Sequence, residues 1–305
     1  MTSSPSAKII ADSVSPTGHR LTTMQVVLHR FVLAEMNTHR CFSRNSASSR
    51  AIPVKKQLER VMNDPAIPLV WPAEQSGMQG GDDLDHITQD TATQIWEAAS
   101  EDAVRAAKTL ASLGVHKSVT NRLLEPFMWH TICVTATEWD GFWDQRISPL
   151  AQPEIKAAAE AMKDAMDASE PRTVVIGGWH LPYIEEQDFI DAFDIAPGIE
   201  LRETGTSSDA TRKAVEVLKR VSTARCARTS YLTQEGSRDL SEDLRLYERL
   251  VSARPLHASP LEHVATPNND WGPHHGNFRG WRQFRHDVEA DAARQARSES
   301  STLVT

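Results

Sequence analysis

The sequence has few cysteines and no cysteine motif. Cys41, Cys133 and Cys226 stand far apart in 305 residues, and none forms a C-x-x-C pair. An odd number of isolated cysteines argues against a disulfide framework and against a zinc site. We therefore predict no metal site and a reducing, cytoplasmic setting.

We also expect no secretory signal and no membrane span. Residues 1–6 are polar and lack the basic and apolar parts of a secretory signal. No apolar run approaches the length of a membrane span. The net charge of -8 disfavours a nucleic-acid partner, and no G-x-G-x-x-G follows a strand, which argues against a Rossmann nucleotide site. We expect a protein that binds neither membrane nor nucleic acid, so any anion site must be local.

With 40% hydrophobic residues the chain can bury a sizeable core. Its patterns predict an α+β chain rich in helix, which we interpret as one domain over residues 1–305 with a mobile insertion at about 63–90. We expect strands at 8–14, 21–28 and 173–176 and helical segments at 30–38, 54–62, 91–113, 118–129, 137–146, 154–167, 209–221 and 241–251.

The strongest helical pattern is at residues 91–113. Its apolar residues repeat at helical spacing and Gly114 closes the segment. We expect the buried face to consist of Ile95, Ala99, Ala103, Ala106, Leu110 and Leu113.

The segment from Thr38 to Arg50 follows a hydrophobic run and is unusually rich in donors. Its thirteen residues include three arginines, one histidine, one asparagine and five hydroxyl side chains. Arginine suits phosphate, and serines at a chain reversal present side-chain and backbone donors together. The segment predicts a site for a nucleotide or flavin phosphate. A solvated loop, a helix cap or a nucleic-acid patch are the alternatives.

The spacing in this segment is specific. It resembles R-H-R-x-x-S-x-N-x-x-S-x-R, the signature of the flavin-dependent thymidylate synthases (the ThyX family). Thr38 replaces the first arginine, and six positions agree: His39, Arg40, Ser43, Asn45, Ser48 and Arg50. The resemblance implies a ThyX-like, helix-rich α+β fold around a central mixed or antiparallel sheet.

A second block, from Arg122 to Ile155, also resembles this family. Arg122 begins the R-x-x-x-P segment and matches a nucleotide-binding arginine. Arg146 matches the arginine that the family holds against the pyrimidine ring. Three family residues linked to the flavin are replaced, by Thr135, Thr137 and Gly141. The alternative for Arg146 is a cap on the carbonyls of its own helix.

A third block consists of R-C-A-R-T-S-Y at 225–231 and H-A-S-P-L-E-H at 257–263. The resemblance implies that Ser230, His257 and Ser259 touch the flavin. In the family these motifs precede the signature, whereas here they follow it. We predict a circular permutation, which folds tolerate when their termini lie close together.

Residues 277–286 loosely resemble the helix that enters the family signature. We hypothesise that Arg282 or Arg285 supplies the positive charge that is missing at Thr38. A basic surface helix is the alternative.

The resemblance implies reductive methylation of dUMP to dTMP, with bound FAD, with NADPH and methylenetetrahydrofolate as co-substrates, and with sites between the subunits of a homotetramer. No cysteine has a convincing nucleophile setting, so we expect electrostatic activation of the base by Arg146, with Ser48 as the other catalytic candidate.

The expected substrate-binding residues are Glu35, Ser46, Ala47, Ser48, Ser49, Arg50, Arg122 and Arg146. The expected cofactor-binding residues are Thr38, His39, Arg40, Asn45, Ser230, His257 and Ser259.

Two other interpretations stay open. The replaced residues at 38, 135, 137 and 141 are compatible with a related methylase or hydroxymethylase that acts on another base, such as dCMP. A nucleotide-binding homologue without flavin chemistry is the third interpretation.

Overall fold

The computed structural model describes residues 4–196, 209–233, 238–268 and 276–302, with side chains to residue 297. Its strands are β1 Ser6–Val14, β2 Arg20–His29, β3 Ser43–Ser46, β4 Trp129–Ala136, β5 Arg172–Thr173, β6 Ala265–Pro267 and β7 Trp281–Gln283. Its α-helices are α1 Leu33–Asn37, α2 Val54–Asn63, α3 His86–Ser112, α4 Lys117–Thr120, α5 Asp140–Arg146, α6 Pro153–Asp167, α7 Glu186–Ile195, α8 Asp209–Arg228, α9 Leu240–Ser252 and α10 Phe284–Thr302. The 3₁₀ turns that lie wholly within the described ranges are η1 Arg30–Val32, η2 Asn121–Phe127, η4 Thr229–Tyr231 and η5 Ser259–Glu262.

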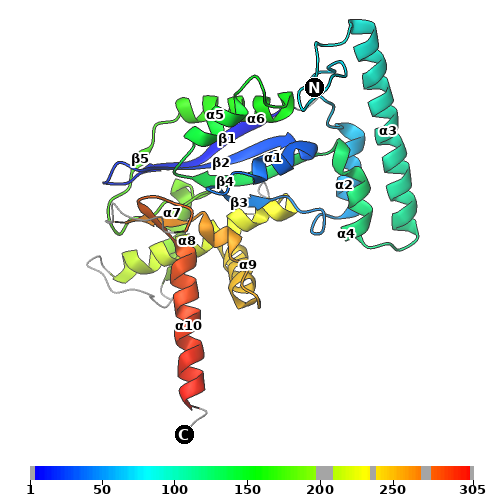
Figure 1. The fold of residues 1–305 in the computed structure, drawn as a ribbon. Helices are drawn as coiled ribbons and strands as arrows, with labels where there is room; N and C mark the ends of the chain where they lie inside the picture. Colours follow the sequence, from blue (N-terminus) through cyan, green and yellow to red (C-terminus); the bar gives the residue numbers. More distant parts are fainter. Residues whose placement is uncertain (1–3, 197–208, 234–237, 269–275, 303–305) are drawn as a thin grey trace.

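A five-stranded sheet organises the fold (Figure 1). Its strand order is β3-β4-β2-β1-β5, in which β1 and β5 are parallel and the other neighbours are antiparallel. The predicted helix-rich α+β fold with a central mixed sheet is therefore confirmed.

The two faces of the sheet are covered differently (Figure 1). On one face, Met24, Val26 and Leu28 of β2 pack with Ile155 and Met162 of α6 in a single buried cluster. Burying each such side chain contributes roughly 1.5–3 kcal/mol. Helices α7, α8 and α9 lie on the other side of the sheet (Figure 1), where polar groups such as Thr23 and Thr135 are buried.

Strand β4 was not predicted. The sequence pattern favoured helix up to residue 129, whereas Trp129 already begins the strand and residues 121–127 form a 3₁₀ turn. All eight residues of β4 are buried, because the strand pairs on both edges and is covered on both faces. A strand in this position shows no polar-apolar alternation that could identify it.

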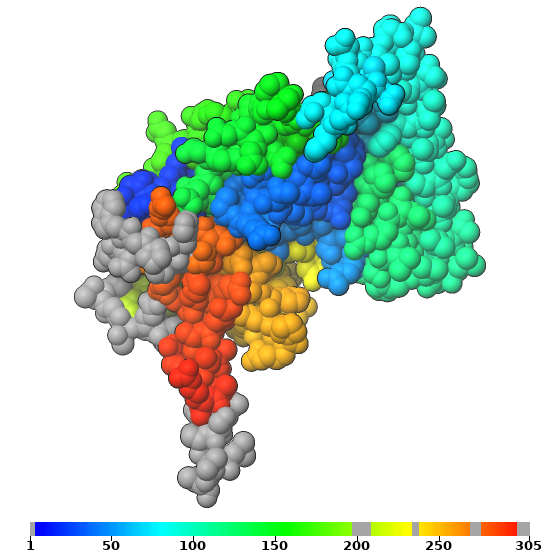
Figure 2. Space-filling view, viewed as in Figure 1, coloured from blue at the N-terminus to red at the C-terminus, as the bar shows by residue number. Residues whose placement is uncertain are grey.

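The face predicted for the long helix was wrong, although the helix itself, α3, is present. Ile95 and Leu113 are 66% and 73% exposed, whereas Ser100, Val104 and Ala107 are buried. The buried face packs against α2 and η2, and α3 lies at the edge of the molecule (Figures 1 and 2). The position of its partners, rather than its richest apolar stripe, decides which face is buried.

The helices after residue 209 share a second core, in which Val217, Val221 and Tyr247 are fully buried. Arg225 of α8 is also buried there and pairs with Asp188 at 2.6 Å and with Asp243 at 2.8 Å. Helix α10 projects away from this body (Figure 1). In the described ranges, no helix combines the length and the apolar content that crossing a bilayer requires.

Candidate active site

A cavity of about 680 Å³ lies where the signature segment meets the C-terminal motifs. Residues from three distant stretches of the chain face it. They are Asn45, Ser48, Arg50 and Ala51, then Lys117, and then Ala227, Ser230, Tyr231, Leu250, Leu256, His257, Ala258, Ser259 and Pro260. Six residues predicted from the motifs therefore share one cavity.

Asn45 joins the signature to both C-terminal motifs. The alternation of β3 turns Ser43 and Asn45 inwards. The Asn45 amide nitrogen donates to the carbonyl of Cys226 at 2.6 Å, and its oxygen accepts from the Ser259 hydroxyl at 3.2 Å. These two bonds hold η5 and the end of α8 against β3.

The chain after β3 turns at the cavity. The Ser48 amide donates to the carbonyl of Ser230 at 3.0 Å, and the Ala51 amide donates back to the carbonyl of Ser48 at 2.9 Å. Lys117 donates to the carbonyl of Ala51 at 2.8 Å. Arg50 and Lys117 thus bring two positive charges to the same end of the cavity, which suits an anionic group.

Arg146 does not line this cavity. Its guanidinium donates to His39 Nε2 and to the Thr38 hydroxyl, both at 2.9 Å, and to the Glu35 carbonyl at 3.2 Å. Arg146 therefore caps the end of α1, so the alternative of a cap on its own helix is wrong. Four predicted residues form this second group, which we call the α1 cluster: Glu35, Thr38, His39 and Arg146.

His39 is held neutral in the α1 cluster. Burial, followed by the charges of Arg146 and Arg44, lowers its pKa to about 4. Its ring packs near Phe42 and Phe142. A neutral imidazole can accept the hydrogen bond from Arg146, and this leaves the guanidinium charge uncompensated by a carboxylate contact among the described residues.

Glu125 engages two residues that were predicted to bind substrate. Its Oε1 accepts from the Ser49 hydroxyl at 2.6 Å, from Arg122 at 2.7 Å and from Arg30 at 3.1 Å. Although burial opposes it, the hydrogen bond from Ser49 and the charges of Arg30 and Arg122 hold the pKa of Glu125 below its ordinary value. Ser49 and Arg122 thus lie close together, because both donate to Glu125. Neither residue lines the cavity.

The remaining predicted residues are more peripheral. Arg40 is exposed, and Ser46 and Ala47 are partly buried, with the Ala47 amide bonded to the Thr131 carbonyl at 2.9 Å. Glu35 has a buried carboxylate oxygen, Oε2, that meets no donor in the described part of the chain.

The hypothesis that Arg282 or Arg285 replaces the charge missing at Thr38 is wrong. Arg285 pairs with Glu262 at 2.6 Å and with Glu289 at 2.8 Å, and Arg282 pairs with Asp287. The positive charge that contacts Thr38 comes from Arg146, whose guanidinium donates to the Thr38 hydroxyl.

Two of the replaced family positions serve the fold. The Thr135 hydroxyl lies 2.6 Å from the Thr23 hydroxyl and 2.7 Å from His263 Nδ1. The Thr137 hydroxyl accepts from the Arg279 amide at 3.0 Å. Both side chains are engaged within the chain.

Sequence reasoning missed several cavity residues. Lys117 belongs to no motif, so nothing in the sequence signalled it. Tyr231 ends the motif that contains Ser230, and Pro260 follows Ser259 in its motif, so both could have been included. Within the described ranges, no group of three or more His, Cys, Asp or Glu side chains is arranged to hold a metal ion.

Residues 9–172, more than half of the chain, match the family model described as thymidylate synthase complementing protein. The chain belongs to this family. The matched range contains the signature, Arg122 and Arg146, whereas the motifs at 225–231 and 257–263 lie outside it. The permuted order of those motifs stays a prediction.

Two solved structures resemble the chain at low identity. Both are described as the UMP/dUMP methylase PolB from Streptomyces cacaoi, one bound with 5-Br dUMP and one with 5-Br UMP. The first has 14% identity and a TM-score of 0.41, and covers 54% of this chain and 90% of its own. The second has 15% identity and a TM-score of 0.44, and covers 54% and 89%. No curated protein sequence matches the chain.

Proposed function

We propose that this chain is a pyrimidine-nucleotide methylase that converts dUMP to dTMP. One observation carries the proposal: residues of the family signature and residues roughly two hundred positions later face the same cavity. Ser48 and Arg50 come from one side, and Ser230, His257 and Ser259 from the other. A nucleotide needs such a combination of a cationic end and polar walls.

The cavity residues fit a flavin. Asn45, His257 and Ser259 offer hydrogen-bond donors and acceptors that suit the edge of a flavin ring, whereas Arg50 with Lys117 suits the phosphate of the nucleotide. We propose that Asn45, Ser230, His257 and Ser259 hold FAD. The bound flavin supplies the hydride, which no amino-acid side chain can carry.

The chain's own part in the chemistry is electrostatic. The 5-carbon of uracil is a weak nucleophile until negative charge develops on the ring, and a fixed guanidinium stabilises that charge. Arg146 is suited to this role because neutral partners orient it: His39, Thr38 and the Glu35 carbonyl. Its hydrogen bonds fix its direction without cancelling its charge.

Arg146 lies outside the cavity of its own chain, so we propose that it serves the site of a neighbouring subunit. This is the arrangement that the family resemblance implies, in a cytoplasmic homotetramer that uses methylenetetrahydrofolate and NADPH. Ser48 then grips the nucleotide in one subunit while Arg146 polarises its base from the next.

Mixing two inactive variants tests this arrangement. Ser48→Ala and Arg146→Ala should each be inactive alone, because each removes one half of every site. After dissociation and joint reassembly, some sites combine an intact Ser48 with an intact Arg146, and we expect partial activity to return. A mixture that stays inactive while it forms mixed oligomers would contradict a shared site.

The activity itself has a direct test. Protein incubated with FAD should turn yellow, and its flavin absorbance should bleach when NADPH is added. With methylenetetrahydrofolate present, tritium should be released from the 5-position of dUMP. Tritium release from dCMP instead would identify a methylase with the same chemistry and a different substrate base. Protein that cannot be loaded with FAD would favour a nucleotide-binding homologue without flavin chemistry.

A further inference from the structure

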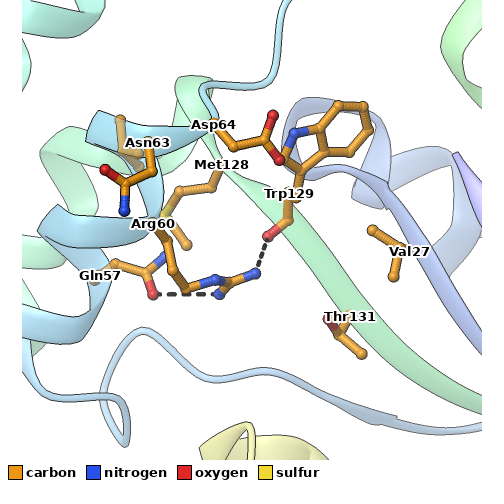
Figure 3. Close-up of a pocket in the computed structure, with 9 residues that line it drawn as sticks. Val27, Gln57, Arg60, Asn63, Asp64, Met128, Trp129 and Thr131 are labelled. Carbon is orange, nitrogen blue, oxygen red and sulfur yellow. Dashed lines mark hydrogen bonds between the residues drawn. The ribbon is translucent and has the colours of Figure 1, made fainter. Parts of the chain in front are cut away.

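A second cavity, of about 390 Å³, lies between α2 and the sheet (Figure 3). It shares no lining residue with the candidate active site. Its apolar part comes from Val27, Val61 and Met128. Its polar part comes from Gln57, Arg60, Asn63, Asp64, Trp129 and Thr131.

Two buried donors in this cavity have no acceptor. Gln57 is fully buried and Trp129 is 7% exposed. The amide nitrogen of Gln57 and the indole N–H of Trp129 meet no partner among the described residues. Buried polar groups are almost always hydrogen-bonded, so two orphaned donors in the lining of one cavity call for a ligand that accepts.

Arg60 adds a charge beside these donors. Its guanidinium donates to the Gln57 side-chain oxygen at 3.5 Å and to the Trp129 carbonyl at 3.2 Å, as Figure 3 shows. Both acceptors are neutral. Burial lowers the pKa of Arg60, and the charge of Asp64 at the cavity opposes that shift.

The bond to Arg60 also explains why Gln57 is orphaned. Its oxygen faces the guanidinium, so its amide nitrogen is the end left without a partner. The guanidinium, the amide and the indole therefore belong to one lining, which also contains an apolar surface and the carboxylate of Asp64. Water alone would not need the apolar surface, and a lone oxyanion would leave much of the volume empty.

We infer that this cavity is a binding site for a small organic anion, namely an oxyanion group attached to an apolar or aromatic body. A carboxylate and a phosphate share the required chemistry, because either accepts from a guanidinium fork and from neutral N–H donors at once. The inference does not rest on the proposed function, since the site is separate from the candidate active site.

The test uses three probes with one ring in common: benzoate, phenyl phosphate and the neutral benzyl alcohol. The indole N–H signals of the ¹⁵N-labelled full-length protein report binding, and Trp129→Phe identifies the relevant signal among the eight tryptophans. We expect saturable movement of the Trp129 signal with benzoate or phenyl phosphate and none with benzyl alcohol. Whichever anion binds more tightly identifies the source of the oxyanion.

Substitutions in α2 sharpen the test. Gln57→Glu keeps the shape but places a carboxylate at the orphaned donor, and Arg60→Met removes the charge. Each should weaken anion binding by about tenfold or more. Arg105→Met, at an exposed arginine of α3, is the matched control and should leave binding unchanged.

Several outcomes would overturn the inference. They are a Trp129 signal that stays fixed with both anions, a signal that moves equally with benzyl alcohol, and anion binding in Arg60→Met and Gln57→Glu that equals binding in the parent. If Arg60→Met fails to fold, Arg60→Lys and Gln57→Glu decide instead. No flavin and no turnover enter the measurement, so its result is independent of the methylase proposal.

Discussion

Arg50 ends the signature segment and Arg225 begins the motif at 225–231, yet the two arginines differ in burial and in their partners. Arg225 is buried between Asp188 and Asp243, which also pair with Arg238 and Arg228. Arg50 is exposed at the cavity. An arginine in a motif is therefore a candidate ligand-binding group only where the fold leaves its charge uncompensated.

The largest expected effect is on stability at Arg225. Arg225→Met leaves Asp188 and Asp243 with one arginine each, and removing one partner from a buried charge network is strongly destabilising. We expect a loss of about 3 kcal/mol in the free energy of unfolding, measured by urea denaturation. A loss below about 1 kcal/mol would show that the network is not the structural element we describe.

Arg50 should behave in the opposite way. Arg50→Met removes an exposed charge, so stability should change by less than about 0.5 kcal/mol. Nucleotide affinity should fall by about tenfold to a hundredfold, since a charge-assisted hydrogen bond is lost. Calorimetric titration with dUMP measures this, and Arg294→Met on the exposed part of α10 is the control. Unchanged affinity in Arg50→Met would remove Arg50 from the site.

The α1 cluster lies between these extremes, because Arg146 has partners but they are neutral. The pKa of His39 is lowered from 6.5 to about 4 in the folded state. Between these pH values the unfolded state binds a proton at His39 and the folded state does not. Stability should therefore fall as pH drops from about 6.5 to 4, by up to about 1.4 kcal/mol per pH unit from this group.

Burial also lowers the pKa values of His130 and His180, each to about 3, so they add to the same acid loss. His39→Gln keeps an acceptor for Arg146 but cannot be protonated, and it should flatten the fall in stability. His86→Gln, at an exposed histidine, should keep the parent slope. Equal slopes in both variants would contradict the neutral state of His39.

The same comparison explains how far the sequence could predict the site. Fixed spacing identified Asn45, Ser48 and Arg50, because those positions must meet one ligand whatever the rest of the chain does. The partners of an arginine come from elsewhere in the chain. Nothing near Arg225 pointed to Asp188, and Lys117 entered the cavity from a stretch without a motif.

The prediction of secondary structure failed at β4 and at the buried face of α3 for a related reason. Strands β1 and β2 were recognised because their residues are typical of strands and turn signals bound them. Strand β4 is buried on both faces, so its sequence lacks any period. On α3, two apolar stripes compete, and only the positions of α2 and η2 choose between them.

Glu125 offers a way to release an arginine that is now paired, with only a small effect on stability. In Glu125→Gln, Arg122 and Ser49 lose the carboxylate that now engages them. Partly exposed ion pairs contribute little, so stability should fall by only about 1 kcal/mol. If Arg122 reaches the nucleotide phosphate, its affinity for dUMP should rise by about threefold or more, because a competing negative charge is gone. Glu97→Gln on exposed α3 is the matched control. Weaker or unchanged dUMP binding in Glu125→Gln would show that Arg122, like Arg225, has a structural role and does not bind the nucleotide.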